Sequence, residues 1–337
     1  MNIILKGRIS KSGYGKATEA FKECFEKIKN HNIDYNLHGE NILKKYDVEF
    51  IIGPPPYSPV KSADYRIVYF YWETTSLPSQ WIQSIITADE IWAPCDLVAD
   101  ACYNAGYNGK ISIVPTPSVS NGIGSDLKLW SKNKNIFLDN SYKFYSIFQW
   151  QPRKGYQKLL QAYFDEFKAD DATLVIKTDL IKNTNESSII KEISYYKERY
   201  KSNSKVFLIT DYLTDNQIFN IHHYCNCFVL PHSGEGWGMP IHEAATFGNP
   251  IITTKFGGIS DFIDDNCFWI NHSLEPVTGM SWNPVYNKNQ NWAAPNVDHL
   301  MELMRYVYNN KVQKTNKFLD FNIENVSKII SGKLNEI

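Results

Sequence analysis

The chain has 337 residues, a length that fits two domains better than a single core. Its 35 basic and 36 acidic residues nearly cancel, which argues against a dedicated nucleic-acid binder, because such proteins carry a basic surplus. A hydrophobic fraction of 43% and an aromatic fraction of 14% are typical of a globular protein and not of a disordered one.

Six cysteines are scattered along the chain, and only Cys225 and Cys227 lie close together. They straddle the start of a predicted strand, which is a poor geometry for zinc, so we expect buried free thiols and no metal site. No apolar run has the length of a membrane span, and the N-terminus lacks the apolar stretch of a signal peptide. We therefore expect a cytoplasmic protein, while a weakly basic N-terminal stretch leaves peripheral membrane association open.

Strands and helices alternate in a first series that ends near residue 114, the pattern of a doubly wound parallel sheet. The predicted strands lie at residues 3–5, 50–52, 67–71, 90–93 and 111–114. The predicted helices lie at residues 17–28, 79–87 and 96–105. An irregular segment follows at 115–117, and the polar run 131–135 is typical of a linker.

A second alternating series begins at residue 144. Its predicted strands lie at residues 144–148, 173–177, 206–209, 227–230, 251–253 and 267–270. Long helices are predicted at 156–167, 187–200 and 297–308, whereas the stretch 275–292 has no period and indicates an ordered loop. The two series predict an α/β protein with two Rossmann-like doubly wound domains that face each other across a cleft.

The strongest functional signal lies between residues 230 and 254. A strand ending at Leu230 is followed by a glycine-rich loop and a helix that Pro240 can begin. Glu235 lies in the loop and Glu243 in the first turns of the helix, with seven residues between them. Free N–H groups at such a helix start favour an anion such as a diphosphate. The plainer alternative is an ordinary well-capped helix whose two glutamates are exposed to solvent. The spacing of the glutamates, the glycines of the loop and the flanking strands together disfavour this alternative.

Two other loops carry groups that suit a phosphorylated ligand. Gly13-Tyr14-Gly15 follows the first strand and can present backbone N–H groups to a phosphate, although an ordinary turn would use the same residues. Arg153 and Lys154 lie between a strand and a helix, where two cations can neutralise a nucleotide diphosphate.

The segment around Glu235 and Glu243 resembles the Glu-x7-Glu signature of retaining glycosyltransferases with the GT-B fold, family 4 (group 1) in particular. The resemblance implies that Glu235 contacts hydroxyls of the donor sugar and that Glu243 binds the ribose of the nucleotide. It implies that the intervening donor-binding residues are Gly236, Trp237, Gly238, Met239 and Pro240.

The same resemblance extends to other parts of the chain. It supports a phosphate-binding role for the loop Gly13, Tyr14 and Gly15, and it matches Lys154 to the phosphate lysine of the family. Many relatives also have an arginine where this chain has Phe148, and we expect Arg153 to take that role.

Three further positions are candidates. Lys177 ends a predicted strand and is an additional candidate cation, with a surface lysine as the alternative. The resemblance places Tyr212 and Leu213 beside the nucleotide base. Trp72 stands where many relatives have a histidine before an acid, so Glu73 either faces the acceptor or caps the next helix.

Four histidines lie in or near the predicted donor-binding half of the site. His222 and His223 fall on a predicted helix and are expected to be half exposed, without the spacing of metal ligands. His232 and His242 flank the key loop and are candidates for supporting positions around it.

The resemblance implies domain roles. Residues 1–140 are expected to bind the acceptor, residues 141–312 the nucleotide-sugar, and a helix within 313–337 is expected to cross back onto the first domain.

The expected activity is that of a retaining glycosyltransferase, most simply a hexosyltransferase, in glycan or polysaccharide synthesis. It would use a UDP- or GDP-sugar, no further cofactor and no metal, and a glycan, lipid-linked or protein-linked acceptor. The expected catalytic residues are Glu235, Lys154, Arg153 and Glu73. Two alternatives remain open: an epimerase that acts on the donor alone, and a catalytically silent GT-B subunit, which the departures at Trp72 and Phe148 favour.

Overall fold

The protein is described here from a computed structural model. It describes all residues except 11, 40, 41, 43, 119–136, 138, 139, 169–171, 181–183, 264–266 and 316–320. The predicted linker at 131–135 lies outside the described residues.

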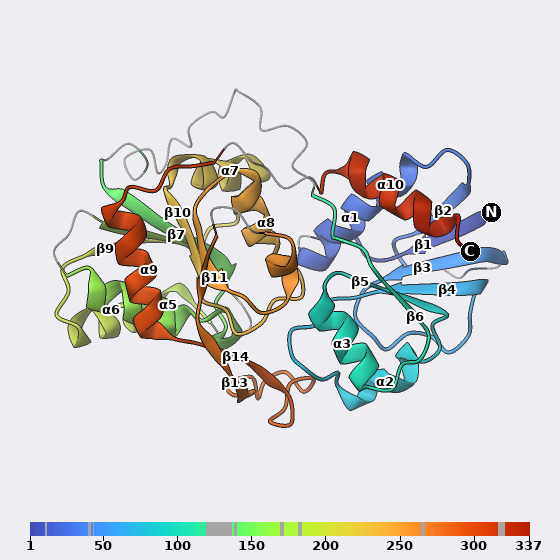
Figure 1. Ribbon diagram of the computed structural model, residues 1–337, viewed down its shortest axis with the longest axis horizontal. Helices are drawn as coiled ribbons and strands as arrows, with labels where there is room; N and C mark the ends of the chain where they lie inside the picture. The colour runs from blue at the N-terminus through green and yellow to red at the C-terminus, as the bar shows by residue number, and fades with distance from the viewer. Residues whose placement is uncertain are drawn as a thin grey trace.

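The first half of the chain forms a six-stranded parallel sheet in the order β2-β1-β3-β4-β5-β6 (Figure 1). Its strands are β1 (Asn2–Lys6), β2 (Asn32–Asn36), β3 (Tyr46–Ile52), β4 (Ala63–Tyr69), β5 (Glu90–Ala93) and β6 (Lys110–Ile113). The helices between them are α1 (Gly13–Glu26), α2 (Ser79–Ile85) and α3 (Asp96–Asn104). The sequence did not predict β2, because this edge strand is largely polar and only Asn36 in it is buried.

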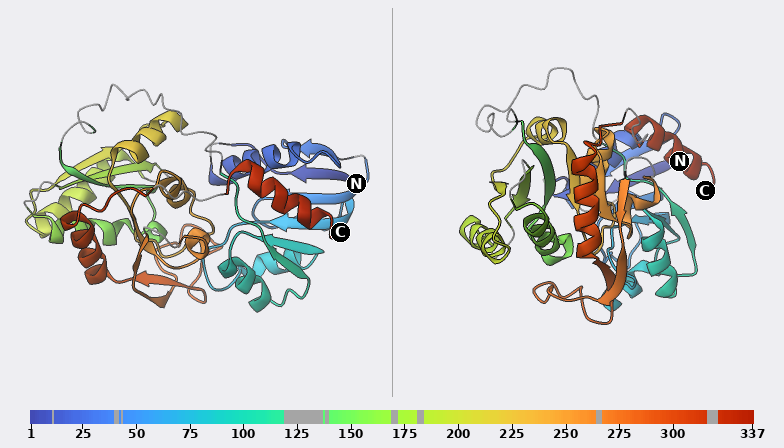
Figure 2. Two further views of the ribbon diagram at one scale, coloured as in Figure 1. Left: turned by 45° about the horizontal axis from the view of Figure 1, so that its top comes forward. Right: turned by 60° about the vertical axis from the view of Figure 1, so that its left-hand side comes forward.

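The second half forms another six-stranded parallel sheet, in the order β12-β11-β10-β7-β8-β9, with helices packed around it (Figure 2). Its strands are β7 (Tyr142–Gln149), β8 (Ala172–Asp179), β9 (Lys205–Ile209), β10 (Cys227–Leu230), β11 (Ile251–Thr254) and β12 (Cys267–Ile270). Its helices are α5 (Tyr156–Glu166), α6 (Glu186–Arg199), α7 (Asp215–Tyr224), α8 (Met239–Thr246) and α9 (Val297–Asn309). The predicted α/β class with two doubly wound sheets is confirmed.

Each sheet reverses its strand order next to its first strand. In the second sheet β7 lies between β10 and β8, so the chain leaves β7 in one direction and later returns on its other side. Ligands of open α/β sheets bind at the carboxyl ends of the strands that flank such a reversal. A ligand-binding site is therefore expected at the carboxyl ends of β7 and β10.

The stretch 275–292 differs from its prediction. Strands β13 (His272–Pro276) and β14 (Asn291–Pro295) pair antiparallel, so both ends of the predicted loop belong to a hairpin. The reason is that β13 is mostly exposed and polar, and it therefore shows no apolar alternation in the sequence.

Helix α10 (Ile323–Leu334), near the C-terminus, packs on the first half of the chain and not on the second. Figure 1 shows it beside α1, and four of its residues are buried in the core of the first sheet: Ile323, Val326, Ile330 and Leu334. The segment that leads into it runs alongside the chain that leaves the first sheet, since the Ser118 N–H donates to the Phe321 carbonyl at 2.7 Å.

We predict that Ile330→Ala lowers the free energy of unfolding by about 2–5 kcal/mol, because it removes a fully buried side chain and leaves a cavity. Urea denaturation measures the change. Lys328→Ala, on the exposed side of the same helix, is the matched control and should change stability by less than about 0.5 kcal/mol. Equal effects of the two substitutions would show that α10 is not part of the core.

Candidate active site

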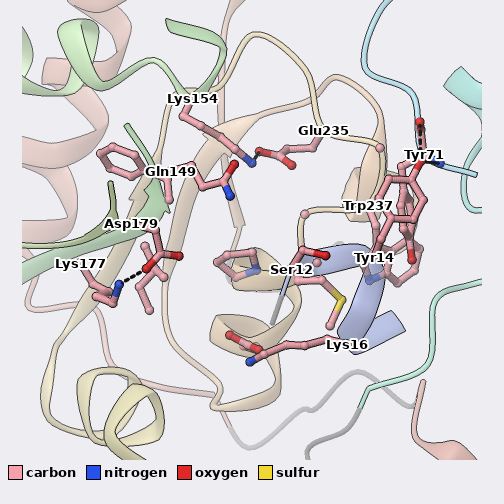
Figure 3. A pocket seen from close by; sticks show the side chains of 18 of the residues that line it. Ser12, Tyr14, Lys16, Tyr71, Gln149, Lys154, Lys177, Asp179, Glu235 and Trp237 are labelled. Carbon is pink, nitrogen blue, oxygen red and sulfur yellow. Dashed lines mark hydrogen bonds and ion pairs between the residues drawn. The ribbon is translucent and has the colours of Figure 1, made fainter. Parts of the chain in front are cut away.

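A cavity of about 430 Å³ lies between the two halves of the chain, at the carboxyl ends of β7 and β10 (Figure 3). The loop after β1 and the segment after β4 form its opposite wall. All of the sequence-predicted site residues except Gly15 line it: Gly13, Tyr14, Glu73, Arg153, Lys154, Lys177, Tyr212, Leu213, Glu235, Gly236, Trp237, Gly238, Met239, Pro240 and Glu243. The N–H group of Gly15 instead donates to the Ser12 side chain, which caps α1.

The glycine-rich loop after β10 packs directly against the backbone of the first half. A Cβ atom on Gly234 would lie 2.0 Å from the carbonyl oxygen of Glu73, and one on Gly236 would lie 2.5 Å from the Cβ of Tyr71. Any side chain at these positions would therefore push the two halves apart. Gly236, which the resemblance places among the donor-binding residues, thus also permits this contact between the halves.

Four charged side chains from three segments meet in the cavity wall. Lys154 forms an ion pair with Glu235, and Arg153 lies 3.6 Å from the same carboxylate through Nη1. Nη2 of Arg153 lies 3.4 Å from Oε1 of Glu73. Each of the four side chains is at most 15% exposed, so water screens these pairs only weakly.

The turn that presents the two cations is fixed by its own backbone. Gly155 has a φ of +68°, and a Cβ atom there would lie 1.8 Å from the carbonyl oxygen of Pro231 at the end of β10. Nη1 of Arg153 also donates to the carbonyl oxygen of Gly234 at 2.5 Å. The cation turn and the loop that holds Glu235 are thus held together as one unit.

The charge states in this cluster follow from burial and from the neighbouring charges. Burial alone would raise the pKa of Glu235, but Lys154 and Arg153 outweigh it and hold that pKa at about 2. The carboxylate is therefore ionised at neutral pH. Burial lowers the pKa of His232, which lies beside this cluster, to about 3, so its ring is neutral and adds no charge.

Glu243 projects into the cavity from α8, and a buried histidine contacts it from behind. Nε2 of His222 lies 3.4 Å from Oε2 of Glu243, and Nδ1 of His222 lies 2.9 Å from the hydroxyl of Tyr145. Nδ2 of Asn249 donates to the Tyr145 hydroxyl at 2.8 Å. The hydroxyl can then donate its own proton to Nδ1 of His222. The proton of the neutral histidine ring therefore lies on Nε2, which faces Glu243. The prediction that His222 is half exposed is wrong, because it is fully buried, whereas His223 is exposed.

The far wall of the cavity holds a second ion pair. Lys177 is only 4% exposed, and its Nζ donates to Oδ1 of Asp179 at 2.5 Å. Asp179 was not among the predicted site residues, although its spacing of two residues from Lys177 on β8 places both on the same face of the strand. Several other lining residues were not predicted either: Ser12, Lys16, Tyr71, Gln149 and Ile218.

Glu73 faces the cavity and does not cap α2. Its Oε2 accepts a hydrogen bond from Tyr286 at 2.8 Å, while Oε1 faces Arg153. Tyr286 comes from the loop between β13 and β14 and stacks on Trp72 with ring centroids 5.2 Å apart. Trp72 is buried in the core of the first half, so it supports Glu73 and does not line the cavity itself.

The described ranges contain neither a metal-binding cluster nor a membrane-spanning helix. No group of three or more histidine, cysteine, aspartate or glutamate side chains there could hold a metal ion. No described helix is long and apolar enough to cross a membrane.

Comparison with known proteins finds a family that resembles the second half of the chain. Residues 130–274, which include the Glu235 loop and the cation turn, match the family described as "Glycosyl transferases group 1". No curated protein sequence matches the chain.

Solved structures with the same architecture cover both halves. The Anabaena protein HepE, in complex with UDP and glucose, has a TM-score of 0.69 at 12% identity over 100% of both chains. A trehalose-6-phosphate synthase, OtsA, has a TM-score of 0.63 at 9% identity over 100% of this chain and 99% of its own. The pneumococcal O-GlcNAc transferase GtfA, in complex with UDP and GlcNAc, has a TM-score of 0.55 at 14% identity over 87% of this chain and 57% of its own.

The family match and the shared architecture together define the class. The protein has the GT-B fold, and its residues 130–274 match the group 1 glycosyltransferase family, so the predictions of the fold and of a glycosyltransferase are confirmed.

We predict a specific pH dependence for the Glu235 cluster. The pKa of Glu235 lies near 2 in the folded protein, below its ordinary value of 4.5, so its contribution to stability is complete above pH 4.5 and is lost as the pH falls toward 2. Glu235→Gln should therefore be less stable than the wild type at pH 6, and the difference should shrink by pH 3. Urea unfolding at several pH values measures both proteins, and parallel pH curves would contradict the assignment.

Proposed function

We propose that the protein is a retaining glycosyltransferase that moves a sugar from a nucleotide-diphosphate sugar to an acceptor hydroxyl in glycan or polysaccharide synthesis. The observation that supports this most is the ionised Glu235 held between Lys154 and Arg153 in a cavity lined by both halves of the chain. Residues 141–312 would bind the donor and residues 1–140 the acceptor.

The cavity offers a complementary group for each part of such a donor. Lys154, Arg153 and the N–H groups at the start of α8, near Gly238 and Met239, would neutralise the diphosphate. Glu243 would accept hydrogen bonds from the ribose hydroxyls, held in place by His222 behind it.

The sugar and the base would occupy the two ends of the cavity. Glu235 would bind the sugar hydroxyls, while Tyr212 and Leu213 would border the base. We propose a UDP-sugar as the donor, since the similar structure HepE is in complex with UDP and glucose.

The chemistry follows from where charge develops. Breaking the glycosidic bond leaves negative charge on the diphosphate, and Lys154 and Arg153 would stabilise it by about 3–4 kcal/mol each if they act like other preorganised groups. Glu73 and Glu235 are both engaged by Arg153, so neither carboxylate is presented as a free nucleophile. This favours attack of the acceptor on the same face as the leaving group, with the leaving phosphate accepting the acceptor's proton.

We predict that Lys154→Met lowers the transfer rate by about 100-fold or more, because the leaving diphosphate loses a buried cation. Initial rates with a UDP-sugar and circular dichroism of the variant test this together. Lys191→Met, an exposed lysine on α6, is the matched control and should retain wild-type rates. A Lys154→Met enzyme with wild-type turnover would exclude the assigned role.

The donor and the stereochemistry have their own test. We expect UDP release from a UDP-sugar within a panel of UDP-, GDP- and ADP-sugars, and we expect the product to keep the anomeric configuration of the donor, as measured by NMR. A changed donor sugar formed without an acceptor would indicate an epimerase. If none of the nucleotides raises the melting temperature of the protein, the result would indicate a catalytically silent subunit.

A further inference from the structure

A second cavity, of about 620 Å³, opens in the first half of the chain at the carboxyl ends of β1 and β3. Nothing in the proposed binding of the donor uses it. Its volume lies within the range of small-molecule sites.

The second cavity adjoins the first. Ser12 and Tyr14, at the start of α1, line both cavities. Hydrogen bonds to the backbone of Tyr71 hold Tyr14 at this boundary, with 2.9 Å between the Tyr71 nitrogen and the Tyr14 hydroxyl. A molecule in the second cavity would therefore lie next to whatever occupies the first.

The charge that lines the second cavity is positive. Lys6 and Arg8 both line it, and among the described lining residues there is no aspartate or glutamate. Lys6 pairs with Glu49 at 2.5 Å, but that fully buried carboxylate also pairs with Arg66 at the same distance. One carboxylate is thus shared by two cations, and Arg8, which is exposed, adds a third positive charge.

Apolar residues also line the second cavity. Ile51, Ile52 and Tyr57 line it, and the Tyr57 hydroxyl donates to the Gly53 carbonyl at 2.8 Å. Apolar side chains together with cations suit a ligand that has a carbon-rich part and an acidic group.

We propose that this second cavity binds the acceptor and that the acceptor carries an acidic group, a phosphate or a carboxylate, which Lys6 and Arg8 recognise. The proposal rests on the proposed function, because only a sugar-transfer reaction requires a second substrate beside the donor. Because the two cavities adjoin, a hydroxyl of the acceptor can reach the donor. The positive charge of Lys6 and Arg8 is the reason for expecting an acidic group on the acceptor.

The test measures binding of charged and neutral sugars to the full chain, with UDP at saturation so that Arg153 and Lys154 are occupied. The probes are glucose 6-phosphate, glucuronic acid and glucose, followed by ligand-observed NMR. We expect at least one anionic sugar to bind about tenfold more tightly than glucose, equivalent to about 1.4 kcal/mol. The two anionic probes distinguish a phosphate from a carboxylate acceptor.

Arg8→Gln should bring the ratio of anionic to neutral affinity down toward one. Lys29→Gln, which removes the same charge from an exposed position outside the cavity, should keep the wild-type ratio. Arg8 is the better choice for substitution, since removing Lys6 would take a partner from the buried Glu49.

Two results would overturn the proposal. In the first, UDP binds but the anionic sugars bind no more tightly than glucose, or Arg8→Gln leaves the preference for anionic sugars unchanged. This inference then fails while the proposed function stands. If UDP does not bind the wild-type chain, the proposed function fails, and this inference fails with it.

Discussion

The buried contact between the cation turn and Glu235 is the interaction on which the site depends. Isolated charges at this depth would be costly, and the charges of Lys154, Arg153, Glu235 and Glu73 are tolerable because two positive and two negative groups balance one another. Three of them come from the second half of the chain and Glu73 from the first. Charge neutrality of the cluster therefore requires the two halves to be in contact, and an incoming anion would have to redistribute those pairs.

Close backbone approach provides the second constraint. The loop after β10 lies so near residues 71–73 that Gly234 and Gly236 have no room for a side chain. The hairpin of β13 and β14 strengthens the same junction through Tyr286, which contacts both Trp72 and Glu73. Steric fit, charge and aromatic packing thus all act on residues 71–73 of the first half. Any change in the contact between the halves at this segment would therefore also change the shape of the cavity.

Much of this arrangement could be predicted from the sequence, and the exceptions have physical reasons. The buried parallel strands and the Glu235–Glu243 segment have strong local patterns, and the structure brings nearly all of the proposed site residues to one cavity. Polar edge strands such as β2 and β13 gave no apolar signal. The burial of His222 and the contact of Tyr286 with Glu73 depend on tertiary packing between distant segments, which local periodicity does not encode.

The position of α10 has a consequence for biosynthesis. The core around the first sheet includes Ile323, Val326, Ile330 and Leu334, which follow the whole second sheet in the chain. Although domains generally fold as units from the N-terminus during synthesis, the first sheet here lacks part of its core until the second sheet and α10 have been synthesised. During that interval the face of α1 that α10 covers is open to solvent, so the first sheet cannot complete its core before the second sheet has been made.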